Sequence, residues 1–130
     1  MNRNKRIVWI IFIAFAVSTC FLMIRGIFLD RKMKKEGKIT TAKIIDYKLG
    51  YRGGISFIYS FNTDGEKIVG KKSFMELVSN RPADFLNKSF PVIYLKDNPS
   101  YNYLLLSRYS FNKFGILFPD SLKWVIKFEK

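Results

Sequence analysis

Histidine is absent from the sequence, and cysteine occurs once. Without histidine the chain offers no Ser-His-Asp triad, no Cys-His dyad and no histidine-containing metal site. A single cysteine, Cys20, cannot form a disulfide within the chain. Acidic side chains are also scarce, with 10 Asp and Glu against 23 Lys and Arg, which gives a net charge of +13. These absences argue against an enzyme, and we expect no cofactor and no metal.

The composition nevertheless predicts a folded protein. Hydrophobic residues make up 48% of the 130 residues and aromatic residues 17%. Disordered chains carry few aromatic and β-branched residues, so this chain is too apolar to be a disordered tail. Its length is that of one domain or less.

The apolar residues are concentrated near the beginning of the chain. Residues 7–24 read IVWIIFIAFAVSTCFLMI, which contains no charge. As a helix this run spans about 27 Å, and an extension to Leu29 brings it to roughly 34 Å. The hydrocarbon core of a bilayer is about 30 Å thick. The sequence therefore predicts a basic tail at 1–6, a transmembrane helix at 7–29 and a basic connector at 30–38 that ends near Gly37.

Basic and aromatic residues flank the predicted span. Trp9 lies near one interface, where tryptophan is common. The basic residues that follow the run are expected to reach the lipid headgroups: Arg25, Arg31, Lys32, Lys34 and Lys35. More basic residues follow the span than precede it, which favours a cytoplasmic domain at a bacterial inner membrane. Anchors with an exported domain also begin with a short basic tail, so the orientation stays open.

Two alternatives to a transmembrane helix are a cleaved signal peptide and a buried helix of a soluble core. A cleaved signal peptide has a short apolar core and a small-residue cleavage site. Residues 17–20 faintly resemble a lipoprotein box ending at Cys20, although the sequence stays apolar afterwards. A buried helix of a soluble core is disfavoured because the run has no polar face.

Strand patterns dominate residues 39–130. Residues 39–49 are rich in β-branched side chains. Apolar side chains then alternate with more polar ones over 55–61, which predicts a strand with one buried face. Residues 62–65 (NTDG) predict a turn, and 66–71 the second arm of a hairpin. Further strands are predicted at 90–95 and 101–106, joined by a turn at 97–100, and at 122–128, where an amphipathic helix is the alternative.

Short helical signals interrupt these strands. Ser73 and Glu76 match a capping box for a helix at 74–79. Pro82 predicts another helical turn through 87, and Ser107 a short helix that ends at Gly115. The expected fold is mainly β: a small antiparallel barrel or sandwich with short helices, preceded by one transmembrane helix.

Several short motifs add a resemblance to a known family. A threonine-alanine pair opens the strand at 41–44 (TAKI), the hairpin carries YSF and DGE, and 92–99 reads VIYLKDNP, a V-x-Y-x-x-x-N-P strand and turn. With the tail at 118–124 (FPDSLKW), this order resembles bacterial membrane-anchored proteins of unknown function, of the uncharacterised Bacteroidetes type. The resemblance covers most of residues 7–125. It implies a membrane location and a β domain, and it brings no catalytic residues.

Candidate reactive groups have simpler interpretations. Asp64 and Glu66 are a carboxylate pair, but they flank a turn glycine, which favours a solvated turn. Ser73 with Lys71 or Lys72 is a conceivable Ser-Lys pair, but the predicted cap accounts for Ser73. We therefore expect no catalytic site.

The remaining candidates are contact surfaces. Tyr51 and Arg52, in the glycine-rich loop 50–54, suit recognition of a partner. Lys71 and Lys72 are basic candidates for anionic lipid or nucleic acid, and a lipid surface is favoured over nucleic acid. The leading hypothesis is a single-pass membrane protein that presents a non-enzymatic β domain to an unidentified protein partner, of accessory or immunity type. A basic membrane-surface or nucleic-acid-binding module is the alternative, and the oligomeric state stays open.

Overall fold

A computed structural model describes residues 2–50, 53–77 and 81–130. The chain divides into two compact units, Met1–Lys32 and Met33–Lys130. The first unit holds most of helix α1 (Arg3–Glu36), and the second holds the last turn of this helix and the β domain. Each unit is described by itself below.

Residues 7–24 of helix α1 are apolar on every side of the helix. None of its most apolar 18-residue window is buried, which excludes the core helix of a soluble domain. Among the described residues this is the one helix long and apolar enough to cross a membrane. Backbone groups in lipid have no water to bind, so a helix is the form that such a segment takes there. The helix fits a single-pass membrane protein or a signal sequence.

The predicted connector is helical for most of its length. Helix α1 continues to Glu36, with Lys34 and Lys35 in its last turn, where cations favour the helix dipole. Gly37 follows, and its N–H donates to the Met33 carbonyl at 2.8 Å. A Cβ at Gly37 would lie 2.7 Å from the Ile93 side chain, so glycine allows the close approach. Met33 is 1% exposed and belongs to the core of the β domain.

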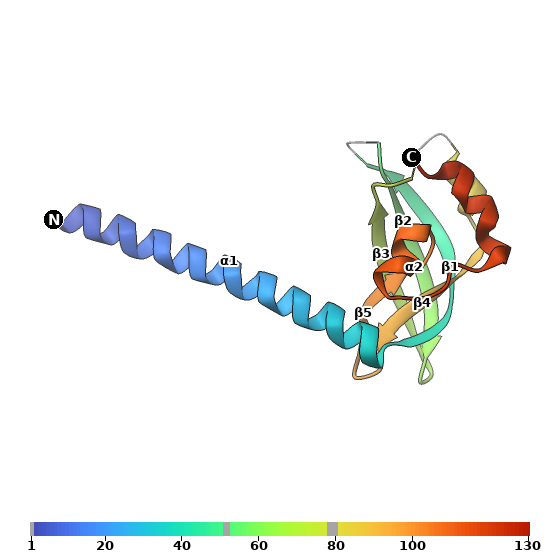
Figure 1. Cartoon of the computed structure of the whole chain (residues 1–130), viewed down its shortest axis with the longest axis horizontal. Coiled ribbons are helices and arrows are strands. Elements are labelled where there is room, and N and C mark those ends of the chain that lie inside the picture. The colour runs from blue at the N-terminus through green and yellow to red at the C-terminus, as the bar shows by residue number, and fades with distance from the viewer. Residues whose placement is uncertain (1, 51–52, 78–80) are drawn as a thin grey trace. The chain divides into compact units, whose positions relative to one another are not determined.

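Five antiparallel strands form one nearly closed barrel-like sheet (Figure 1). They are β1 (Lys38–Leu49), β2 (Ile55–Thr63), β3 (Glu66–Phe74), β4 (Ser89–Leu95) and β5 (Asn98–Leu104), in the order β3-β2-β1-β4-β5. A fourth strand that returns beside the first after a three-strand meander is a Greek key. The connectivity is that of the five-stranded Greek-key barrel known as the OB-fold. The expected mainly β fold after one long helix is confirmed.

Strand β1 serves both halves of the barrel. Its first residues pair with β4, from Lys38–Tyr94 to Lys43–Ser89, and its later residues pair with β2, from Lys43–Ser60 to Leu49–Ile55. The register of the β1–β2 ladder shifts between Ile44 and Asp46. A bulge of this kind bends and twists a strand. It allows one long strand to join both sides of a small barrel.

Side chains close the seam between β3 and β5. The Lys72 ammonium lies 3.9 Å from the centre of the Tyr103 ring, a cation–π contact. A Cβ at Gly70 would lie 2.6 Å from the Tyr59 ring and 2.7 Å from Asn102 Oδ1, so the missing side chain lets β3 approach β5. The two strands run parallel, because each is four antiparallel steps from the other along the sheet.

The β2–β3 hairpin matches its sequence signals. Ile55, Phe57, Tyr59 and Phe61 are all buried, as their alternation predicts. Asp64 and Gly65 form the turn with φ of 49° and 77°. Two successive positive φ values suit a two-residue hairpin and explain the Asp-Gly pair.

Aromatic rings fill one end of the barrel. The 3-10 helix η1 (Pro82–Phe85) places Phe85 there, fully buried. Its ring centre lies 5.0 Å from Phe57, 5.2 Å from Trp124 and 4.9 Å from Phe128. The last two rings come from η2 (Asp120–Phe128), the C-terminal helix (Figure 1, red). The predicted helical turn at Pro82 is thus a 3-10 turn that plugs the barrel.

Helix α2 (Arg108–Lys113) confirms the cap predicted at Ser107. The Ser107 hydroxyl accepts a hydrogen bond from the Ser110 N–H, and Ser110 Oγ accepts from the Ser107 N–H. Gly115 follows with a φ of 68°. Glu129 accepts from the Arg108 backbone N–H at 2.8 Å and from Arg108 Nε at 2.6 Å, and so ties the C-terminus to the start of this helix.

Three local predictions were wrong. Ser73 is not a helix cap, because it lies in β3 opposite Ser56. A turn and a bridge at 75–77 replace the start of the predicted helix. Residues 78–79 of that prediction lie outside the described part of the chain. The turn after β4 falls at 96–97, so β5 begins at Asn98. The tail forms the 3-10 helix η2, so the predicted strand is wrong and the helical alternative is the one found, in 3-10 form. It buries Leu122, Val125 and Phe128, every third residue, as three residues per turn requires.

Candidate functional site

A polar groove opens where β1 diverges from β2. The β1–β2 ladder begins at the Lys43–Ser60 pair. Residues before Lys43 pair with β4, and residues after Ser60 pair with β3. The divergence leaves an open groove of about 370 Å³ on the outer face of the sheet. We call it the fork groove. Its lining residues are Thr41, Ala42, Lys43, Ser60, Phe61, Asn62, Lys67 and Ser89.

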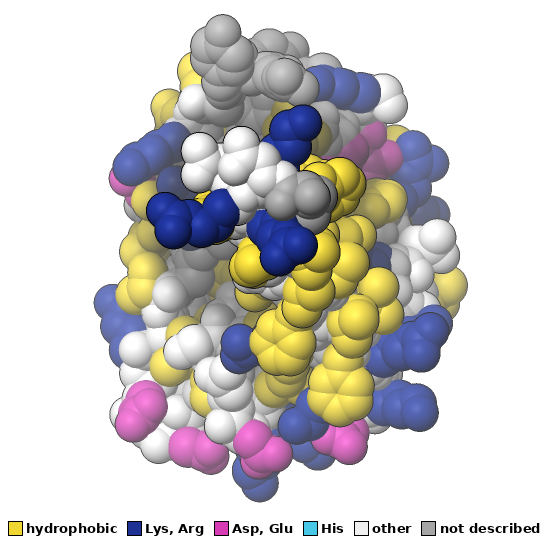
Figure 2. Space-filling view, turned by 90° about the vertical axis from the view of Figure 1, so that its left-hand side faces the viewer, with side chains coloured by type: hydrophobic (Ala, Val, Ile, Leu, Met, Phe, Trp, Pro, Cys, Tyr) yellow, Lys and Arg dark blue, Asp and Glu magenta, His cyan; other side chains and the backbone are white. Residues whose placement is uncertain are grey.

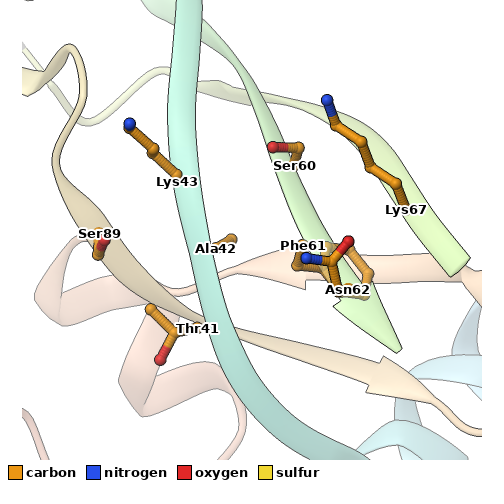
Figure 3. A pocket seen from close by; sticks show the side chains of 8 residues that line it. All are labelled: Thr41, Ala42, Lys43, Ser60, Phe61, Asn62, Lys67 and Ser89. Atoms are coloured by element: carbon orange, nitrogen blue, oxygen red, sulfur yellow. The ribbon is translucent and has the colours of Figure 1, made fainter. Parts of the chain in front are cut away.

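Four strands contribute polar side chains to the fork groove (Figure 3). The close-up shows Ser60 between the side chains of Lys43 and Lys67. Side chains alternate between the two faces of a strand, so the exposed residues of each strand share the outer face. Ala42 and Phe61 are buried and form the floor. Phe61 is supported from inside by the Tyr94 ring, 5.5 Å away.

The electrostatics of the fork groove favour an anion. Lys43 and Lys67 are both exposed, and none of the lining residues is acidic. Among the described residues, neither lysine has a carboxylate within 4.0 Å. Hydroxyl and amide groups of Thr41, Ser60 and Asn62 stand beside them as further donors. The groove can therefore hold a carboxylate or a phosphate group.

The sequence candidates do not form one surface. Lys71 is exposed on the outer face of β3, opposite Ile58. Lys72 points the other way and lies over Tyr103 in the seam. Tyr51 and Arg52 lie outside the described residues. The Lys and Arg side chains on the face shown in Figure 2 are spread out and do not form one patch, so net charge alone selects no site.

The membrane-flanking basic residues all lie on α1. Arg25, Arg31 and Lys32 belong to the first unit, and Lys34 and Lys35 belong to the exposed last turn in the second. Their role toward lipid stays a prediction.

The candidate reactive pairs have structural explanations. Asp64 belongs to the hairpin turn, and Glu66 pairs with Thr63 at the start of β3. The Ser73 hydroxyl is hydrogen-bonded to the Ser56 hydroxyl across the hairpin, at 2.7 Å. Within the described ranges, no three Cys, Asp or Glu side chains come together as a possible metal-binding group.

One buried polar network lies inside the barrel. The Tyr59 hydroxyl donates to Asn102 Oδ1, and Asn102 Nδ2 donates to the Pro99 carbonyl at 3.0 Å. Burial raises the pKa of Tyr59 well above its usual value, because the phenolate would lose its hydration. This network joins β2 to β5 and supports the fold.

The site residues Lys43, Ser60, Asn62 and Lys67 were missed by sequence reasoning. The alternation in β2 already assigned Ser60 and Asn62 to the outer face. It did not show that Lys43 and Lys67 flank them, because that neighbourhood depends on the register of three strands.

Fold and groove together define a Greek-key barrel domain with a basic, polar groove on its outer face. Comparison with protein-family models, curated proteins and solved structures gives no match.

Proposed function

We propose that the protein is a single-pass membrane protein whose β domain binds an acidic segment of a protein partner in the fork groove. The observation that carries the proposal is the pair of exposed lysines, Lys43 and Lys67, in a lining without any carboxylate. Charge complementarity of this kind steers association and selects partners. The proposal includes no catalytic step and no cofactor.

Fold analogy supports the choice of surface. OB-folds bind their ligands on the face of their second and third strands. In this domain, β2 and β3 supply Ser60, Asn62 and Lys67 to the fork groove.

The distribution of aromatic rings favours a protein partner over single-stranded nucleic acid. Proteins that bind single strands stack bases on exposed aromatic side chains. In the described strands β2 and β3, the outward residues are Ser56, Ile58, Ser60 and Asn62, and Lys67, Val69, Lys71 and Ser73. None of these is aromatic, because the Phe and Tyr side chains of β2 point into the core.

The test measures binding of a labelled hexaglutamate peptide to the full chain in neutral-lipid nanodiscs, by fluorescence anisotropy. The double variant Lys43→Gln, Lys67→Gln should bind about tenfold more weakly, a loss of about 1.4 kcal/mol. The matched control Lys48→Gln, Lys71→Gln removes the same two charges at exposed positions outside the groove and should leave the affinity within about twofold.

Three outcomes would contradict the proposal. Equal binding by the double variant and the wild type would show that the peptide binds outside the groove. Equal losses in the double variant and its control would show that the peptide responds to net charge alone. Binding of a single-stranded oligonucleotide that depends on Lys43 and Lys67, without peptide binding, would assign the groove to nucleic acid.

A further inference from the structure

The most exposed apolar side chain of the β domain lies in the loop between α2 and η2. Leu117 is 91% exposed, although a leucine in water is unfavourable. We call residues 115–119 the apolar loop. It lines an open hollow of about 480 Å³ together with the exposed Tyr109.

The apolar loop is held in shape by its own contacts. The Ile116 N–H donates to the Phe111 carbonyl at 3.0 Å. The Phe118 ring lies edge-on to the buried Phe111 ring, with centres 5.3 Å apart. Both neighbours of Leu117 are thus fixed to α2, while Leu117 itself projects into solvent.

The apolar loop lies beside the last turn of α1. A Cβ at Gly115 would lie 3.4 Å from Lys34 Cε. Lys34 follows Leu29, the last residue of the predicted span, by five residues of helix α1, which span about 7.5 Å. Headgroup layers add roughly 5–8 Å on each side of the hydrocarbon core. The chain therefore holds the loop within reach of the headgroups.

The surroundings of the apolar loop are basic. Arg108, whose guanidinium is paired with Glu129, lines the same hollow, and Lys34 and Lys113 are exposed nearby. None of the residues that line the hollow is acidic. Apolar and aromatic side chains among basic ones are typical of segments that bind at the surface of an anionic bilayer.

We propose that the apolar loop inserts Leu117 into the bilayer interface, so that the β domain is held against the membrane at a second point besides its helix. Leu117 enters the acyl boundary, Tyr109 lies at headgroup depth, and the neighbouring cations face anionic lipid. This inference rests on the proposed single-pass membrane location and is independent of the fork groove and of its partner.

The test places a single fluorophore on the full chain in vesicles. In a Cys20→Ala background, Leu117→Cys carries an environment-sensitive NBD label. The vesicles contain phosphatidylcholine and phosphatidylglycerol at three to one, with a lipid whose acyl chain bears a nitroxide quencher. The control site is Lys48→Cys, which is exposed and ten residues along β1 from Lys38, about 33 Å away.

The label at 117 should emit at shorter wavelength than the label at 48 and should be quenched about twofold more strongly by the acyl nitroxide. Equal spectra and equal quenching at the two sites would overturn the inference. A blue shift at 117 that disappears when vesicles carry one chain each would also overturn it, because a second copy, not lipid, would then cover the loop.

Discussion

Replacing Phe85 by alanine should strongly destabilise the β domain. Phe85 is the ring around which the closed end of the barrel packs, and none of its surface is exposed. It contacts rings from β2, β4 and η2, the nearest at 4.9 Å. The substitution removes a whole ring from a site where four other rings cannot all move inward.

The free energy of unfolding should fall by about 4–5 kcal/mol, the upper part of the range for replacing a buried phenylalanine by alanine. The loss is at the upper end because the cavity and the lost ring pairs add to the transfer free energy of the side chain. A domain of this size is stable by about 5–15 kcal/mol, so the variant should be near the limit of folding. Phe85→Leu keeps most of the volume and should cost about 1.5 kcal/mol or somewhat more.

Trp124 supplies the assay. Its ring lies 5.2 Å from Phe85 and 4.1 Å from the Lys88 ammonium, so its fluorescence reports the packing of this end. The chain has two tryptophans, and Trp9→Phe leaves Trp124 as the one reporter. Urea titration of the full chain in detergent gives the free energy of unfolding. Leu117→Ala, at an exposed site, is the control and should change stability by less than about 0.5 kcal/mol. A loss below about 2 kcal/mol for Phe85→Ala would refute the packing argument.

Three further substitutions test other contacts by the same titration. Tyr59→Phe should cost about 1–3 kcal/mol at neutral pH, because Asn102 Oδ1 loses its donor. The pKa of Tyr59 is raised in the folded state, so the stability that this phenol contributes is complete below about pH 10 and is lost as the pH rises further. Above about pH 10 the free energy of unfolding of the wild type should therefore fall more steeply than that of Tyr59→Phe, by up to about 1.4 kcal/mol per pH unit. Glu129→Gln should cost about 1 kcal/mol, because it weakens the charged acceptor for Arg108; an unchanged midpoint would show that the C-terminus is not held there. Gly65→Ala should cost about 1–2 kcal/mol from the positive φ alone, since no atom lies within 4 Å of the added Cβ, and a neutral result would contradict the turn geometry.

Elements specified by neighbouring residues could be predicted from the sequence. The alternation from Ile55 to Phe61 and the Asp64-Gly65 turn produce the hairpin without reference to the rest of the chain. The start of α2 at Ser107 is equally local, since both members of its cap lie within four residues.

Elements that depend on distant partners could not be predicted in this way. Ser73 and Glu76 have the spacing of a cap, but Ser73 bonds to Ser56 and the Glu76 carboxylate accepts from Ser107, 31 residues away. These tertiary partners outweigh the local helix signal. The tail sequence fits both a strand, in which every second side chain is buried, and a 3-10 helix, in which every third one is. Packing of Trp124 and Phe128 against Phe85 favours the helix.

The fork groove shows the same limit for a binding site. Its lining comes from four strands, and its two lysines are neighbours through the pairing of Lys43 with Ser60 and of Lys67 with Asn62. A shift of one residue in either ladder would turn one lysine into the core. Residue types alone therefore do not reveal the site.

The seam between β3 and β5 has a consequence for how the domain fluctuates. In the described strands, β3 and β5 share no hydrogen-bonded ladder, so they can separate while every ladder of the sheet stays intact. Such a crack would admit water to Tyr59 behind Gly70. Amide deuteration in native conditions should consequently spread inward from the outer edges of these two strands, with β1, the central strand of the sheet, exchanging last.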